Sequence, residues 1–348
     1  SKPIRVLDQK IKVLYLEGPP RWEYRFLKNA LIRDPTMAAR VYLYSADRGF
    51  IQESSPGEPP LSEFPGTREE LFQYHVVIIG DVEQDAFRKG EMDLLKDFVS
   101  EAGGGVVFIA GENANPARYL DTPLYALLPV EVPEGGRGGS EPGPNDSFNV
   151  ELTGVGREHP VLRLDNDPER NRELWENRDG IETRHLPPFY WCAEVNREKV
   201  GAVELAVNPR RSHPAYGPRP VLAFQNLGKG RTFFSAVDNT WRWRAGVENL
   251  YFYKFWGQVI RFAASGRLLG KTRRYSLATD KLVYTLGEKI GIDARVYDAN
   301  MKPSTEESIR IFHQVVAVTD SSQKAPEPVV LNLSRPKGPG SYEGTLPA

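Results

Sequence analysis

Two short stretches decide the fold: VVIIGD at residues 76–81 and GGGVVFIAGEN at residues 103–113. Each contains a continuous apolar run that ends in a glycine and an acidic residue, which is typical of a strand buried on both faces. Between them, residues 85–100 place apolar side chains at helical spacing, and the glycines from Gly103 provide a helix stop. Buried strands separated by helices predict a parallel sheet with helices on both faces.

The same alternation continues in both directions along the chain. We expect strands at residues 11–16, 41–44, 200–207, 221–225 and 231–237, and helices at residues 22–32, 68–74 and 247–264. Residues 131–146 (EVPEGGRGGSEPGPND) form a low-complexity stretch that predicts a flexible loop inside the domain. The sequence therefore predicts one α/β domain over residues 1–268, with a flavodoxin-like parallel sheet.

From Tyr275 onward the helical spacing disappears. Apolar residues alternate instead, as at Ile290 and Ile292 and again at Ile309 and Ile311, and Gly or Pro turns separate the runs. This pattern predicts an all-β, immunoglobulin-like sandwich over residues 269–348. We expect it to be truncated, because a complete sandwich of this kind needs roughly 100 residues.

The composition excludes several classes of function. The 45 basic and 46 acidic residues give a net charge of −1, so we expect no nucleic-acid partner. No apolar run approaches the roughly 20 residues that span a bilayer, so we expect no membrane insertion by this segment. The lone Cys192 excludes a cysteine zinc site, and the five histidines lack metal-ligand spacing. We expect neither a metal nor a cofactor. The chain begins at Ser1, which suggests a fragment of a longer protein.

Charged and aromatic residues follow the predicted strands. The carboxyl ends of parallel strands meet at one edge of a sheet, where ligands bind in open α/β folds. The candidate crevice there consists of Glu17, Arg21, Trp22, Glu23, Asp81, Glu112, Asn113, Asp238, Trp241 and Arg244. The carboxylates could bind a hard cation, pair with Arg21 and Arg244, or cap helices; we favour an Arg–carboxylate network. Trp241 to Arg244 could stack a planar or anionic ligand, or pack under the sheet edge.

Three segments carry a resemblance to a known family: KVLYLEGPPRWEYRFLKNAL (12–31), GVVFIAGENANPARYLDTPLYALLPVEV (105–132) and GKGRTFFSAVDNTWRWRAGVENLYFYKFWGQVIRF (228–262). They resemble the glutamine amidotransferase-like domain of bacterial membrane proteins that carry von Willebrand factor A domains. The β segment resembles the immunoglobulin-like modules beside such domains. The resemblance implies an extracytoplasmic, periplasmic setting, with membrane anchors outside this segment. It also implies that the partners are other domains of the full-length protein, the von Willebrand factor A domain in particular, or separate proteins.

The residues that such amidotransferases use for catalysis are missing here. The family has a cysteine at a strand-to-helix elbow, where this chain reads Gly111-Glu112-Asn113, and a His–Glu pair where it reads Asp238-Asn239-Thr240. Cys192 lies among aromatic residues, which favours a core role. We therefore expect no catalytic residues and predict a non-catalytic binding or scaffolding module, a pseudoenzyme. The alternatives are a small-molecule or metal-binding sensor and a hydrolase that uses the carboxylates at the strand ends.

Overall fold

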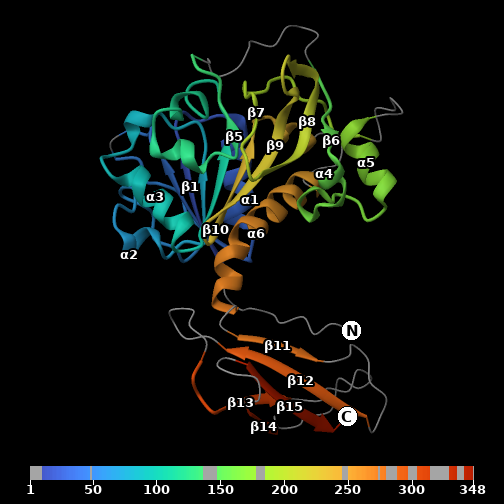
Figure 1. Ribbon diagram of the computed structural model, residues 1–348. Coiled ribbons are helices and arrows are strands. Elements are labelled where there is room, and N and C mark those ends of the chain that lie inside the picture. The colour runs from blue at the N-terminus through green and yellow to red at the C-terminus, as the bar shows by residue number, and fades with distance from the viewer. Residues whose placement is uncertain are drawn as a thin grey trace. The chain divides into compact units, whose positions relative to one another are not determined.

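The computed structural model describes residues 10–47, 49–135, 147–177, 185–244, 250–272, 275–279, 288–296, 304–313, 329–334 and 341–347. The chain divides into two compact units, Ser1–Arg267 and Leu268–Ala348 (Figure 1). Most of the predicted loop, residues 136–146, lies outside the described residues.

The first unit is a mixed α/β structure around an eight-stranded sheet in the order β2-β1-β3-β4-β10-β9-β8-β6. Five strands are parallel: β1 (Ile11–Glu17), β2 (Met37–Leu43), β3 (Val76–Ile79), β4 (Gly105–Ile109) and β10 (Gly230–Ser235). The remaining three pair antiparallel: β9 (Gly217–Leu227), β8 (Ala202–His213) and β6 (Glu151–Leu152).

The prediction of a wholly parallel sheet is thus correct for one half of the sheet and wrong for the other. The reason is the short connection between β9 and β10, where Gly228 has φ +58°. A glycine in the left-handed region permits a tight hairpin, and a hairpin joins antiparallel strands.

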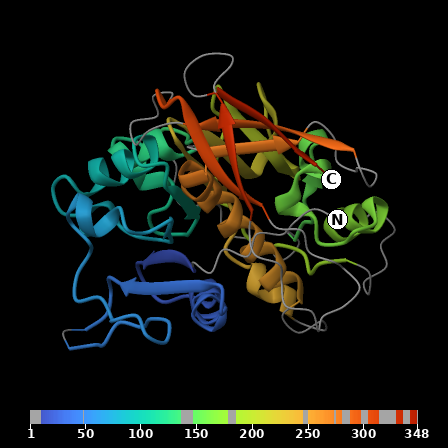
Figure 2. The same cartoon turned by 90° about the horizontal axis from the view of Figure 1, so that it is seen from below.

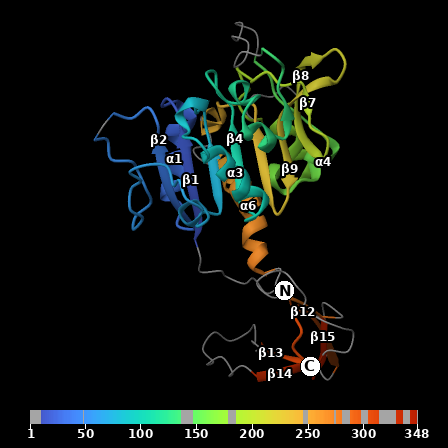
Figure 3. The same cartoon turned by 60° about the vertical axis from the view of Figure 1, so that its left-hand side comes forward.

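Helices cover both faces of the sheet. The α-helices are α1 (Trp22–Arg33), α2 (Arg68–Leu71), α3 (Glu91–Ser100), α4 (Gly154–Glu158), α5 (Pro168–Glu176) and α6 (Leu250–Thr272). Helix α3 lies on one face, and α1 and α6 lie on the other (Figures 1, 2 and 3). Alternate residues of the buried strands reach these two layers: Phe108 shares a core cluster with Phe98 of α3, whereas Tyr15 contacts Tyr24 of α1 with ring centroids 5.5 Å apart. The fully apolar strands predicted this double covering.

Short elements connect these layers. They are the 3₁₀ turns η1 (Gln84–Ala86), η2 (Ala117–Tyr119), η3 (Pro123–Leu127), η4 (Pro160–Leu162) and η6 (Thr240–Arg244), and the paired strands β5 (Val130–Glu131) and β7 (Arg197–Glu198). The helix expected over residues 85–100 begins only at Glu91, because Gly90 adopts φ +88° and separates it from η1. Helix α6 continues past the expected end at residue 264, as far as Thr272.

The second unit contains a five-stranded antiparallel sheet in the order β11-β12-β15-β14-β13. The strands are β11 (Tyr275–Thr279), β12 (Lys289–Val296), β13 (Ser308–His313), β14 (Val329–Ser334) and β15 (Ser341–Pro347). Tyr342 is fully buried against Ile292 and Ala294, and its hydroxyl donates to Ser304 Oγ at 2.9 Å. An immunoglobulin-like sandwich needs a second packed sheet, and the described part of this unit forms one sheet, so the sandwich is not confirmed.

Among the residues that the structure describes, no helix combines the length and the apolar character that a membrane span requires.

Candidate functional site

Arg21, the residue before α1, ties together three strand ends at the carboxyl edge of the sheet. Its Nε donates to Glu17 at 3.3 Å, at the end of β1, and its Nη2 donates to the Ile109 carbonyl at 3.0 Å, at the end of β4. Its Nη1 donates to Asp238 Oδ2 at 3.1 Å, after β10, and to the Ala110 carbonyl. The Arg21 side chain is only 14% exposed, so the guanidinium acts here as a buried cross-link.

Glu17 is fully buried, and protein donors surround its carboxylate. The Tyr15 hydroxyl donates to it at 3.0 Å and the Asp81 backbone N–H at 2.7 Å, in addition to Arg21. Burial raises the pKa of Glu17, and the charge of Arg21 opposes that rise. A Cβ on Gly80 would lie 2.3 Å from the carboxylate oxygens, so the glycine that ends β3 leaves the room that Glu17 occupies.

Asp81 holds the turn after β4 rather than a ligand. Its carboxylate accepts from the backbone N–H groups of Asn113, Ala114 and Asn115 at 3.0, 2.8 and 3.1 Å, and from Asn113 Nδ2 at 2.7 Å. A Cβ on Gly111 would lie 2.2 Å from Asp81 Cγ, so this strand end also requires a glycine. Asp81 is only 2% exposed, and these four hydrogen-bond donors account for the position of its carboxylate without any bound cation.

Glu23 joins α1 to two elements that follow β10. It is fully buried and accepts from the Thr240 hydroxyl, from the Trp241 backbone N–H at 3.1 Å and from Trp256 Nε1 of α6 at 3.1 Å. Burial raises the pKa of Glu23 to about 7. The Arg–carboxylate network expected from the sequence thus consists of Glu17, Arg21 and Asp238, while Glu23 is held by neutral donors.

Beside this network the side chains become accessible. Trp22 is 54% exposed and lies 5.7 Å from Trp241, and Phe26 stacks within 6.0 Å of both rings. Arg244 lies 3.9 Å from the centroid of Phe26, and Arg242 lies 4.7 Å from that of Trp241. Of the two alternatives for this segment, packing into the core describes Trp243, which is 1% exposed, but not Trp241.

Phe26 and Trp241 also line a pocket of about 400 Å³, which we call the aromatic–arginine pocket. It is lined by Phe26, Pro187, Tyr190, Trp241, Arg242 and Arg244. Sequence reasoning missed Phe26 and Tyr190. Phe26 lies one helical turn after Trp22 and so shares its face of α1, a spacing that could have predicted the contact. Tyr190 comes from a segment without a periodic pattern, and only the tertiary structure brings it here.

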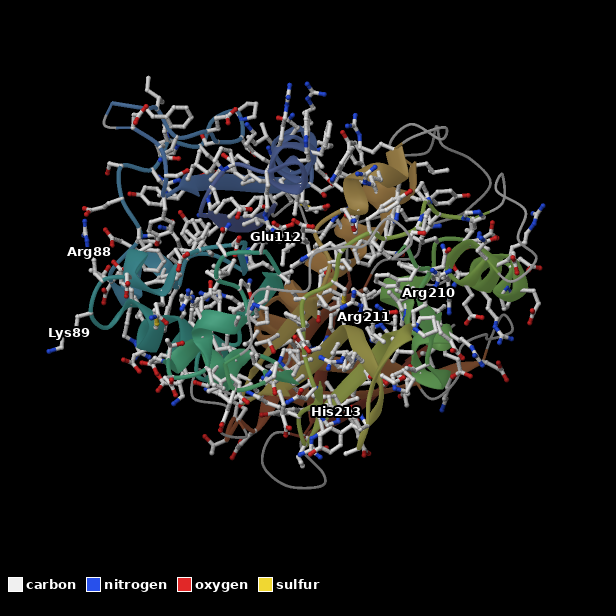
Figure 4. All side chains as sticks on the ribbon, turned by 90° about the horizontal axis from the view of Figure 1, so that it is seen from above. Arg88, Lys89, Glu112, Arg210, Arg211 and His213 are labelled. Atoms are coloured by element: carbon white, nitrogen blue, oxygen red, sulfur yellow. The ribbon has the colours of Figure 1, made fainter. Side chains whose placement is uncertain are left out.

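Glu112 and Asn113 line a different and broader pocket of about 940 Å³. Figure 4 shows Glu112 on the face seen from above. Further carboxylates on its walls are Glu83, Asp85 and Asp121. Within the described parts of the chain, no group of three or more His, Cys, Asp or Glu side chains has the geometry to hold a metal ion.

Comparison with known proteins finds similarity among solved structures alone. No family model matches the chain, and no curated protein matches it. Among solved structures, it is similar to a β-galactosidase from Bacillus circulans sp. alkalophilus, at 12% identity over 97% of this chain and 42% of that one, with a TM-score of 0.38. It is also similar to an exo-β-1,4-mannosidase from Opitutaceae bacterium strain TAV5, at 14% identity over 74% of this chain and 36% of that one, with a TM-score of 0.37.

The amidotransferase-like identification is withdrawn: no family model supports it, and the two solved structures named above are glycosidases. The prediction of a non-catalytic pseudoenzyme falls with it, since the missing Cys and His–Glu pair argue for inactivity only within the amidotransferase family. The chain spans less than half the length of either glycosidase. At TM-scores below 0.5, the likenesses themselves assign neither a fold family nor an activity to this chain.

Proposed function

We propose that the chain is a hydrolase that acts at the carboxyl edge of the sheet, with Asp238 as its working carboxylate. One observation carries the proposal: Asp238 is fixed by Arg21 at 3.1 Å and still has a side chain 22% exposed, just before the segment that lines the aromatic–arginine pocket. Glu17, Glu23 and Asp81, in contrast, are at most 2% exposed. A carboxylate that is both oriented and reachable by water is what a general base requires.

The fold supports this location. The strand order β2-β1-β3-β4-β10 matches the order 2-1-3-4-5 of flavodoxin-like sheets, and we propose that the first unit is flavodoxin-like in this half. Such sheets bind ligands outside the carboxyl ends of their strands. Asp238 follows β10 directly at that edge.

The electrostatics suit proton transfer from water. Burial raises the pKa of Asp238, and the charge and hydrogen bond of Arg21 limit the rise. A carboxylate with a raised pKa is a stronger base, and Arg21 holds one oxygen so that the other can point toward a water molecule. In this mechanism the substrate lies against the aromatic–arginine pocket, and Asp238 takes a proton from a water molecule as the water oxygen bonds to the substrate. The bond to the leaving group breaks, and the proton held by Asp238 passes to the leaving group.

The pocket suggests the class of substrate. Trp241 and Tyr190 present ring surfaces, and Arg242 lies within 4.8 Å of both ring centroids. A guanidinium stacked on a ring keeps N–H groups at its edge for a carboxylate or phosphate. We therefore infer a small substrate with a planar or ring-shaped face and a negative charge.

Asp238→Asn tests the proposal, because it keeps the shape and removes the base. The assay screens the full chain against chromogenic glycosides, carboxylic esters and phosphate esters, each with and without an anionic substituent. We expect turnover of at least one class by the parent, reduced about 100-fold or more in the variant. Asp97→Asn, on the exposed surface of α3, is the matched control and should retain full activity. Failure of the parent to turn over any class, or equal rates in the two variants, refutes the proposal.

The second candidate is a sensor that binds the same class of ligand without turnover. The complete pairing of Glu17, Glu23 and Asp81 by protein donors favours it, since these groups then serve structure alone. Quenching of Trp fluorescence by an anionic aromatic compound, without product and unchanged in Asp238→Asn, distinguishes the sensor from the hydrolase.

A further inference from the structure

Helices α1 and α6 lie on the same face of the sheet, and residues of both line a pocket of about 310 Å³, which we call the interhelix pocket (Figures 1 and 3). Each helix contributes side chains three or four residues apart, which therefore share one face of that helix. They are Leu27, Ala30 and Leu31 of α1 and Trp256, Gly257 and Ile260 of α6. The interhelix pocket shares no lining residue with the aromatic–arginine pocket.

The space in this pocket depends on two positions that carry little or no side chain. Gly257 lies inside α6, and apart from the backbone of its own helix, a Cβ there would meet within 4 Å only the Arg261 guanidinium. Ala30 of α1 presents only a methyl group. Glycine is a poor helix former compared with alanine or leucine. A larger side chain at position 257 would occupy the pocket, so the glycine keeps this space open.

Buried apolar side chains make up much of the pocket wall. Leu27, Leu31, Trp256 and Ile260 are at most 2% exposed. The one polar atom of the Trp256 ring already has a partner, because Nε1 donates to Glu23 at 3.1 Å. An apolar group that enters the pocket is removed from water, and its burial favours binding.

An arginine without a protein partner also lines the pocket. Arg33, in the last turn of α1, is exposed, and within the described ranges its side chain forms no hydrogen bond or ion pair. The acidic neighbour is engaged: Asp34 Oδ1 accepts from the Thr36 N–H at 2.8 Å and from its hydroxyl at 2.7 Å. The other oxygen, Oδ2, lies 3.9 Å from Arg261. The Arg33 guanidinium is therefore free to pair with an external anion.

We propose that the interhelix pocket binds a small amphipathic carboxylate, with its apolar body between the helices and its carboxylate on Arg33. Charge complementarity selects this occupant, because Arg33 and Arg261 outnumber Asp34 beside an apolar space. A guanidinium can hold a carboxylate through two parallel hydrogen bonds. The volume sets the size of the ligand: at roughly 30 Å³ for a water-sized group, the pocket holds on the order of ten non-hydrogen atoms.

The experiment titrates the full chain by calorimetry with octanoate and, in a second arm, with phenylacetate. Both are carboxylates of the expected size, one aliphatic and one aromatic. We expect saturable binding of at least one of them, and the tighter arm identifies the kind of apolar body. Octan-1-ol, the neutral counterpart of octanoate, should bind about fivefold more weakly than octanoate, which is the size of effect expected of an ion pair near the surface.

Two variants test the two ends of the ligand. Gly257→Leu fills the pocket and should abolish binding by a chain that still melts cooperatively, because leucine is a better helix former than glycine. Arg33→Gln should weaken octanoate binding about fivefold and leave octan-1-ol binding unchanged. Arg170→Gln is the matched control, since it removes the same charge from an exposed position in the first turn of α5, and it should bind as the parent does.

Several results would overturn the proposal: no saturable binding of either carboxylate, equal affinity for octanoate and octan-1-ol, undiminished binding by Gly257→Leu, or equal effects of Arg33→Gln and Arg170→Gln. Self-association of the parent in sedimentation, abolished by Gly257→Leu, would also overturn it, because the pocket would then be an interface between copies of the chain. None of these measurements depends on turnover, so the interhelix pocket and the hydrolase proposal can fail separately.

Discussion

Charged side chains have different environments in the two halves of the eight-stranded sheet. In the parallel half, β3 and β4 are buried along their whole length, and the charged groups that follow the strands are engaged by the protein itself, as Arg21 is with Glu17. In the antiparallel half, β8 ends in partly exposed residues, and Arg210 and Arg211 line an open pocket. The comparison shows that one edge of a sheet can combine buried charges that cross-link strands with charges at the surface.

The largest expected effect comes from Arg21→Ala in the parallel half. The substitution leaves Glu17 buried without its counter-charge, and loss of one partner of a buried ion pair costs about 3–5 kcal/mol. Urea unfolding followed by fluorescence measures the change in the free energy of unfolding. Arg210→Ala in the antiparallel half, where the side chain is exposed, should cost about 1 kcal/mol or less. Equal costs at the two positions would remove the distinction between the halves.

The glycines at the strand ends are the next test. Gly111→Ala should destabilise the chain by about 2–3 kcal/mol, because its Cβ would overlap an Asp81 carboxylate that four hydrogen bonds hold in place. Gly154→Ala introduces the same methyl group where nothing lies within 4 Å, and it should be nearly neutral. A thermal melt of both variants measures the difference, and similar melting temperatures would show that Asp81 can move aside.

The third test concerns pH. The pKa of Glu23 is raised from its ordinary 4.5 to about 7, so the folded chain holds this proton more tightly than the unfolded chain. The contribution of Glu23 to stability is therefore complete below pH 4.5 and is lost as the pH rises toward 7. In Glu23→Gln, the fall in unfolding free energy across this window should be smaller by up to about 3 kcal/mol. Parallel profiles for parent and variant would mean that Glu23 titrates normally.

Much of the parallel half could be predicted from the sequence, because apolar runs such as VVII at residues 76–79 have no other stable environment than a doubly covered sheet. The proximity of Glu17, Arg21 and Asp238 could also be predicted, because the carboxyl ends of parallel strands lie at the same edge of a sheet. The partners of Glu23 could not be predicted, because Thr240 and Trp256 reach it only through tertiary packing. The bulge in β8 was missed although Pro209 inside the strand marks it.

The contacts of Arg21 and Glu23 also govern when the crevice can form. Arg21 reaches Asp238 across 217 positions of sequence, and Glu23 reaches Trp256 across 233. During synthesis from the N-terminus, these two side chains emerge early, but their partners emerge only when nearly the whole first unit has been made. Until then Glu17 and Glu23 belong to a nascent chain that cannot bury them in their final form. The crevice can therefore form only after nearly the whole first unit has been synthesised. A formed crevice indicates that the first unit has folded.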